Sequence, residues 1–295
     1  MPYPEYIESL ATVLIGFILP LFTVLSFAFI IPPVLKRIVQ EKRDGVKELM
    51  KMMGLPTWMN WVFYFFDALM TLVFTILLMV IIACIEWEAG EGKVLEFSDP
   101  SIVFFFFLFY SMALVVFLFS ISTIFSNRKC IFLFNNIYMY FNYIHLILAN
   151  LALTAGIVIH IVGFMIVFAT INDDKYASMS GGAKIFYAMI YPNIGLQWGI
   201  KVMVSHEISG AGAQWSNLFS RKLEDDPITM GVVWVLFLVN VLIFGTITWY
   251  IDSVHPGPYG VAKKWYFCFR VCISAINVFV QIQLARQFFI IISKC

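Results

Sequence analysis

Three polar side chains lie within long apolar stretches of this chain, where a titratable group could carry a proton or contact a substrate. Asp67 lies about ten residues into the stretch 57–85, and His145 and His160 lie within the uncharged stretch 131–171. A charge placed inside a bilayer is expensive and often functional, so Asp67 is a candidate relay for protons or substrate. We favour the alternative, a protonated or hydrogen-bonded carboxyl that faces a neighbouring helix, because no other predicted span contains Lys or Arg.

The residues that usually bind metal ions have no suitable spacing. His145 and His160 are 15 positions apart and cannot share a helical face as ligands at i and i+4 do, so we expect them to pack or to line a pathway. The five cysteines are scattered without a C-x-x-C pair, which favours neither a disulfide framework nor a zinc site. We therefore predict no metal site and no catalytic residue.

A second group of candidate residues lies in the segment 38–55, IVQEKRDGVKELMKMMGL, which predicts an amphipathic helix. Apolar residues recur at spacings of seven, four and three from Val39 to Met53, so they share one face and leave the charged residues on the other. Gly54, followed closely by a proline, supplies a stop. Such a helix could rest on anionic lipid headgroups, or it could dock a cytoplasmic partner through its methionines. Physical grounds alone favour the surface helix.

The composition decides which kind of structure must position these residues. Of 295 residues, 61% are hydrophobic and only 13% are charged, and the mean hydropathy is +0.89. In soluble domains about a quarter of residues are charged, so the surplus apolar surface must face lipid. The net charge of +1 indicates neither a nucleic acid nor an acidic partner. We expect an all-α polytopic membrane protein that binds no nucleic acid.

About five spans are predicted. A spanning helix needs about 20 mostly apolar residues, because the hydrocarbon core is about 30 Å thick and each residue rises 1.5 Å. The predicted spans are 10–35, 57–85, 101–125, 131–150 and 231–251.

The region 151–204 is harder to assign, because it could hold an extra span or a re-entrant element. Residues 183–204 are apolar but are interrupted by Pro192 and Gly195. Such a break suits two half-helices that dip into the bilayer and return, shielded by protein. We favour the re-entrant pair.

The distribution of basic residues predicts the orientation, since cytoplasmic loops are enriched in Lys and Arg. The loop after the first predicted span is rich in both, and Arg128 and Lys129 follow the third. The loop after the second span is acidic. We therefore expect an integral, multi-pass protein with its N-terminus outside and the region of Lys263 in the cytoplasm.

Specific motifs add a family resemblance. The stretch EKRDGVKELMKMMGLPTWMNW resembles the signature that follows the second span in transmembrane domains of ABC transporter subfamily A, the lipid-exporting branch. The matching residues are Glu41, Lys42, Lys47, Glu48, Met52, Met53, Gly54, Leu55 and Trp58. Two further stretches, GAQWSNLF from Gly212 and TWYIDSVHPGPYGVAKKWYF from Thr248, resemble later motifs in the family's order. The resemblance covers about residues 10–267.

The resemblance implies an ABC-2 type, or type II exporter-like, transmembrane domain over residues 1–267. In that family the segment matching 38–55 is a cytoplasmic coupling helix that docks an ATPase domain, which moves our preference to partner docking. Two short helices dip into the outer leaflet before the last span, as we expect of 183–204. Membrane lipid would be the substrate. A nucleotide-binding domain and a second transmembrane half would be the partners.

The sequence also departs from the family's pattern at several positions. Asn240 stands where the family usually has aspartate, and the tail 268–295 matches nothing known in it. The sequence contains no G-x-x-x-x-G-K-[ST] loop for ATP phosphates. We therefore expect no enzyme activity and no cofactor in this chain, which would end before the nucleotide-binding domain and use ATP only through a missing or partner domain. The alternatives are an ATP-independent channel or lipid scramblase, motivated by Asp67 and the histidines, and an inactive truncated fragment.

Overall fold

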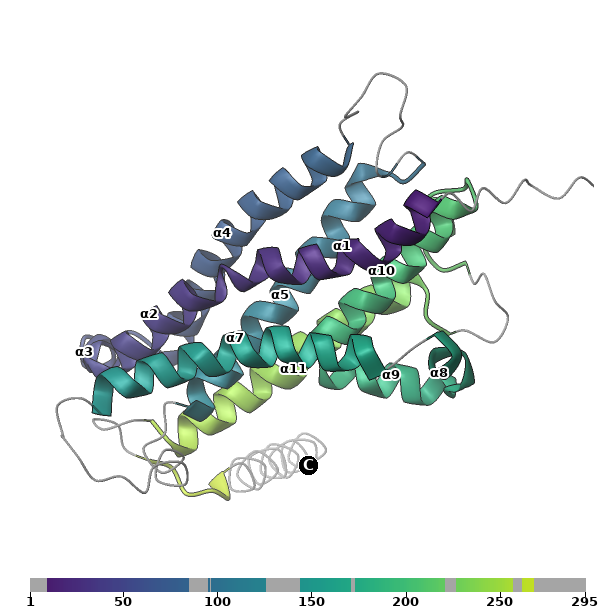
Figure 1. Cartoon of the computed structure of the whole chain (residues 1–295). Coiled ribbons are helices and arrows are strands. Elements are labelled where there is room, and N and C mark those ends of the chain that lie inside the picture. Colours follow the sequence, from purple (N-terminus) through teal and green to yellow (C-terminus); the bar gives the residue numbers. More distant parts are fainter. Residues whose placement is uncertain are drawn as a thin grey trace, which may run out of the picture.

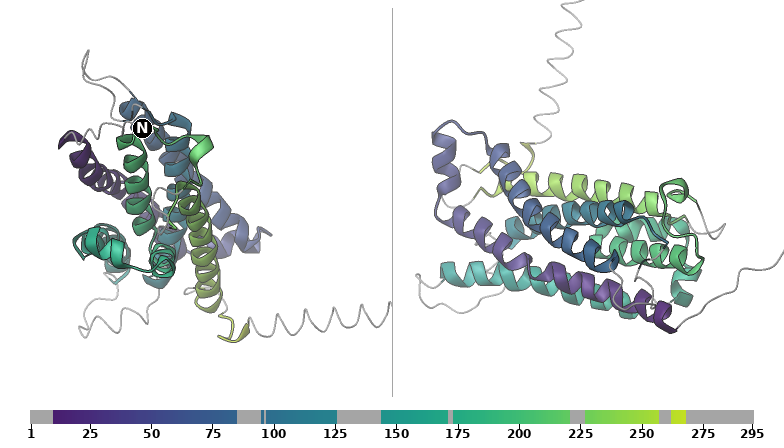
Figure 2. Two further views of the ribbon diagram at one scale, coloured as in Figure 1. Left: turned by 90° about the vertical axis from the view of Figure 1, so that its right-hand side faces the viewer. Right: turned by 90° about the horizontal axis from the view of Figure 1, so that it is seen from above.

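The computed structural model describes residues 10–84, 95, 97–125, 144–170, 173–220, 227–256 and 262–267, and it describes side chains for most of these residues from Leu19 onward. All regular elements in these ranges are helices. By length and composition, four of the described helical stretches could cross a membrane: Leu19–Glu41, Thr57–Ala83, Pro100–Ile124 and Met230–Val254. The expected all-α polytopic membrane fold is confirmed. Figures 1 and 2 show the long helices side by side in an elongated bundle, with α3 at one end and α8 at the other.

Helical structure continues beyond the expected end of the first predicted span. Helix α1 (Leu10–Ala28) is followed after two residues by α2 (Ile31–Arg43), with Pro32 and Pro33 in the first turn of α2. Proline is tolerated there because the first N–H groups of a helix have no intrahelical partner. The prolines therefore divide two helices, and the second helix continues to Arg43, while the membrane limits of the span 10–35 stay a prediction.

Helix α5 (Pro100–Phe125) forms the centre of the bundle. It packs against α4 (Thr57–Cys84), α11 (Met230–Val254) and α7 (Ile144–Thr170). In the most apolar window of α5, 72% of residues are buried, against 22% in α4. Helix α5 is thus shielded by protein, whereas α4 turns most of its side chains outward.

Helix α7 corrects a predicted boundary. The sequence favoured a span at 131–150 that ended before a separate element, but one helix runs unbroken through Ile144–Thr170. No proline or charged residue lies in this range to interrupt it. The small residue Gly156 lets α7 approach α2, because a Cβ at this position would overlap the side chain of Leu35. Residues 131–143 lie outside the described part of the chain.

The predicted interruption near Pro192 separates two helices. Helix α9 (Gly181–Ile190) ends at Tyr191, whose backbone is extended, and α10 (Pro192–Ile208) begins at the next residue. At 10 and 17 residues, both are shorter than the 20 or so that a span needs. Gly195 does not break α10, because it lies inside this helix, against Phe237. The re-entrant placement of α9 and α10 stays a prediction.

Close packing at Gly199 gives a test of the bundle. A Cβ at Gly199 would overlap the ring of Phe106, whereas a Cβ at Gly182 would meet no atom within 4 Å. We expect Gly199→Ala to lower the free energy of unfolding by about 1–3 kcal/mol through overpacking. Gly182→Ala should be neutral or slightly stabilising, since alanine favours helix. Thermal unfolding of both variants in detergent checks this, and equal stabilities would contradict the packing of α10 on α5.

Candidate functional site

The segment 38–55 forms two helices, which corrects the prediction of one. Helix α2 ends at Arg43, and α3 (Val46–Met52) begins after the turn at Asp44 and Gly45. Gly45 has a φ of 71°, in the left-handed region that glycine adopts at little cost. A helical pattern of apolar residues continues across this turn, but the glycine changes the direction of the chain.

The predicted coupling residues divide between these two helices and the loop that follows. Glu41 lies on α2, where it accepts hydrogen bonds from Arg37 Nε at 3.1 Å and from the Tyr64 hydroxyl. Lys42 lies on the same helix, but its side chain is outside the described part. Met52 on α3 and Met53 just after it are 79% and 68% exposed. The methionines therefore form an outward surface at this end of the bundle.

The loop that closes the segment is exposed as well. Gly54 has a φ of 93°, and Leu55 is 42% exposed. Helix α4 begins two residues later, at Thr57, so this short loop joins α3 directly to a long apolar helix.

Lys47 turns inward and forms a buried ion pair with Asp252 near the end of α11. The side chains of Lys47 and Asp252 are only 11% and 6% exposed. Trp61 Nε1 donates a second hydrogen bond to the same carboxylate oxygen at 3.2 Å, and Lys47 Nζ lies 5.5 Å from the centroid of the Trp61 ring. One carboxylate therefore ties α3 and α4 to α11. Asp252 was not among the residues predicted from the sequence, although it is the acidic residue at the end of an apolar helix.

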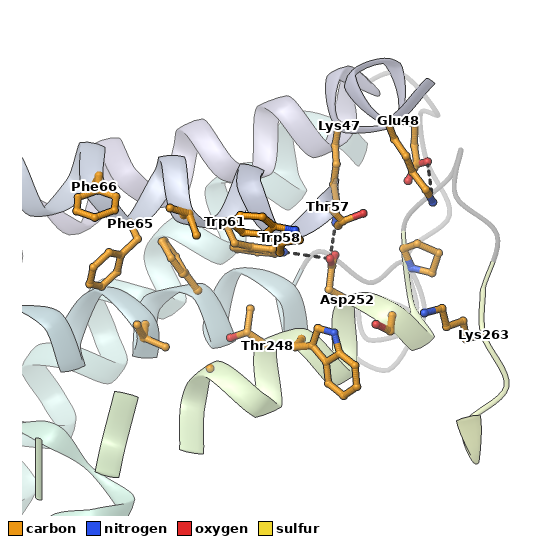
Figure 3. A pocket seen from close by; sticks show the side chains of 18 residues that line it. Lys47, Glu48, Thr57, Trp58, Trp61, Phe65, Phe66, Thr248, Asp252 and Lys263 are labelled. Atoms are coloured by element: carbon orange, nitrogen blue, oxygen red, sulfur yellow. Dashed lines mark hydrogen bonds and ion pairs between the residues drawn. The ribbon is translucent and has the colours of Figure 1, made fainter. Parts of the chain in front are cut away.

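A cavity of about 590 Å³ opens beside this ion pair (Figure 3). Its wall is largely apolar and aromatic, and the charged side chains come from α3, the end of α11 and the segment after it. The residues that line it are Lys47, Glu48, Lys51, Thr57, Trp58, Trp61, Val62, Phe65, Phe66, Val116, Phe119, Gly245, Thr248, Trp249, Asp252, Ser253, Pro256 and Lys263.

Asp67 forms an ion pair with a neighbouring helix. Its carboxylate accepts a hydrogen bond from Arg37 Nη1 at 2.5 Å, and the two side chains are 48% and 43% exposed. The sequence analysis placed Arg37 in a loop beyond the first span. Because α2 extends to Arg43, Arg37 instead lies on a helix beside α4 and reaches Asp67.

The two candidate histidines lie on one helix, far apart. His145 is in the first turn of α7, and its side chain is outside the described part. His160 is buried, with Nε2 3.1 Å from the carbonyl oxygen of Val24 and Nδ1 3.1 Å from Nδ2 of Asn193. The amide nitrogen of Asn193 can only donate, so Nδ1 of His160 accepts and Nε2 carries the proton. Among the residues that the structure describes, no cluster of His, Cys, Asp and Glu could hold a metal ion.

Asn193 connects His160 to the helix break. Its Nδ2 also donates to the carbonyl oxygen of His160 at 3.0 Å, and its Oδ1 accepts from the Tyr110 hydroxyl at 2.9 Å. The Tyr191 hydroxyl donates to the carbonyl oxygen of Ile159 at 2.7 Å. We call Tyr110, His160, Tyr191 and Asn193 the polar node. It joins α1, α5, α7 and α10 through uncharged groups, which suits a structural role.

The buried Lys47–Asp252 pair gives a stability test. We expect Asp252→Asn or Lys47→Met to lower the free energy of unfolding by about 3–5 kcal/mol, because the remaining partner stays buried and charged. Lys51→Met is the matched control on the same helix, since Lys51 is 58% exposed and lies 3.8 Å from Glu48. An exposed pair of this kind contributes only about 0–1 kcal/mol. Denaturation in detergent measures the difference, and equal losses for Lys47→Met and Lys51→Met would refute the burial of the pair.

Comparison with known proteins identifies the relatives of this chain. No protein-family model matches it. Phospholipid-transporting ATPase ABCA3 from Homo sapiens is 30% identical over 270 residues, which are 90% of this chain and 14% of the relative. Retinal-specific phospholipid-transporting ATPase ABCA4 from Homo sapiens is 27% identical over 270 residues, 90% of this chain and 10% of the relative.

ATP-binding cassette sub-family A member 2 from Homo sapiens is 26% identical over 267 residues, again 90% of this chain and 10% of the relative. The chain thus spans between about a tenth and a seventh of the length of the curated relatives that it matches. The chain is therefore homologous, over most of its length, to a segment of the subfamily A ABC transporters, and the predicted family relationship is confirmed.

Proposed function

We propose that this chain forms the membrane part of an ATP-driven phospholipid transporter, with an ABC-2 type transmembrane domain over residues 1–267. Two of the relatives are named as phospholipid-transporting ATPases. This chain contains no phosphate-binding loop, so the ATPase activity would come from a nucleotide-binding domain beyond the segment described, acting with a second transmembrane half.

The main support for the proposal is that α3 has one face exposed at the surface and another that contacts α11. Met52 is exposed at the outer surface, where a methionine can adapt to an irregular groove of an ATPase domain. Lys47 faces inward and is held by Asp252 on α11. A displacement of α3 by a docked domain would reach α11 through this pair, because separating buried partners costs several kcal/mol.

The geometry also supports the proposed orientation. Lys47 and Lys263 line the same cavity, so α3 and the segment after α11 lie at the same end of the bundle. Both segments are basic, and basic segments favour the cytoplasmic side. The proposal therefore puts α3 in the cytoplasm, where ATP and its hydrolysing domain are found.

A site-specific photo-crosslinker tests the docking surface. Benzoylphenylalanine at Met52 should form a covalent product with a co-expressed nucleotide-binding domain of ABCA3, because Met52 is exposed on α3. Met70 is the matched control, since it is 72% exposed but lies on the mid-part of α4. The yield of crosslinked product is quantified on gels after the membranes are illuminated. No product at Met52, or equal yields at both positions, would contradict docking through α3.

A second candidate function, ATP-independent lipid scrambling, is favoured by the half-exposed Arg37–Asp67 pair on the outward surface of α4. A charged pair on an apolar surface could let lipid headgroups cross the hydrocarbon core of the bilayer. If the chain is a scramblase, fluorescent phospholipid should equilibrate across reconstituted vesicles without ATP, and Asp67→Asn should slow this while Asp44→Asn in the exposed turn does not. Transfer that requires ATP and a nucleotide-binding domain would instead exclude the scramblase.

A further inference from the structure

We propose that the cavity beside Lys47 and Asp252 binds one anionic phospholipid, with its phosphate near Lys51 and Lys263 and an acyl chain along the aromatic wall. The inference rests on the proposed function, that this chain handles phospholipid, and it names the class of headgroup and the place where the lipid binds. The position of the cavity, its charges and its wall each support it.

The cavity lies at one membrane boundary. Thr57 begins α4, and Asp252 lies near the end of α11, so the cavity joins the ends of two antiparallel helices that are long enough to span. Lipid headgroups occupy this level. Phe65 follows Thr57 by eight residues, so the wall extends about 12 Å along α4 from the boundary. The wall therefore runs along α4 in the direction in which the acyl chain of a bound lipid would lie.

The charges around the cavity favour an anion. Three lysines and two carboxylates line it, which leaves one net positive charge. Lys47 and Asp252 neutralise each other in their buried pair. Lys51 is 58% exposed and lies 3.8 Å from Glu48, which partly balances it, and Lys263 Nζ lies 5.0 Å from the centroid of the Phe267 ring. A phosphate would balance the remaining positive charge, whereas a choline group would add another cation close to it.

The wall suits a hydrocarbon chain. Trp58 and Trp249 are 61% and 53% exposed, and they line the cavity together with Phe66. Gly245 forms part of the floor, and the nearest atom to a Cβ there would be Val116 Cγ1 at 3.8 Å. The absence of a side chain at Gly245 therefore keeps the cavity open. Its volume lies within the range of about 300–1,000 Å³ typical of small-molecule sites.

Tryptophan quenching tests the headgroup. The full chain is reconstituted in nanodiscs of phosphatidylcholine that contain a minor fraction of lipid with brominated acyl chains. Brominated phosphatidylglycerol should quench tryptophan fluorescence more than brominated phosphatidylcholine at the same fraction. Lys263→Gln should abolish this excess. Lys264→Gln is the matched control, because Lys264 does not line the cavity and its Nζ lies 5.7 Å from the Tyr266 ring. Equal quenching by both lipids, or equal loss in both variants, would overturn the proposal.

Two further measurements test the acyl chain. Gly245→Leu should remove the excess quenching by filling the cavity, whereas Gly245→Ala, which adds one methyl group at van der Waals distance, should keep most of it. Soluble glycerol phosphate in excess should not restore the fluorescence. If it does, the lysines bind phosphate alone, and the acyl wall is wrong.

This experiment needs neither ATP nor a partner, so the two proposals can fail separately. Selective quenching without ATP-driven transfer would refute the transporter and keep the lipid site. ATP-driven transfer without selective quenching would refute the lipid site alone.

Discussion

The break between α9 and α10 lies inside an apolar bundle, and the polar node holds it to the neighbouring helices. Tyr191 is extended between α9 and α10, and Asn193 follows in the first turn of α10. The node uses neutral groups only, so it ties the break to α5 and α7 without placing a charge in the node. Asn240 adds a similar bond, because its Nδ2 donates to the carbonyl oxygen of Ala188 at 3.0 Å and ties α11 to α9.

The end of the bundle that carries α3 is held by charges instead. There the Lys47–Asp252 pair and the Trp61 indole connect α3, α4 and α11, and a cavity remains open beside them. The break between α9 and α10 thus lies beside a network of neutral hydrogen bonds, whereas a cavity opens at the end that carries α3.

The sequence predicted the helical class, the positions of most long helices and the family, because these follow from apolar composition and local motifs. It placed a boundary at residue 150 that α7 does not have, and it did not predict that the helix after Pro32 and Pro33 continues to Arg43. Arg37 was consequently assigned to a loop, and its pairing with Asp67 was missed. The Lys47–Asp252 pair joins residues 205 positions apart, and no local pattern specifies such a contact.

Gly45 has a mechanical consequence. It separates two ion pairs, with Arg37–Asp67 holding α2 to α4 on one side and Lys47–Asp252 holding α3 to α11 on the other. Because the left-handed residue interrupts the helix, bending there needs no helical hydrogen bond to break. Helix α3 is seven residues long, a rigid arm of about 10 Å. A force on the far end of α3 would rotate this helix about Gly45. The rotation would pull on α11 through the Lys47–Asp252 pair, while α2 stays in place.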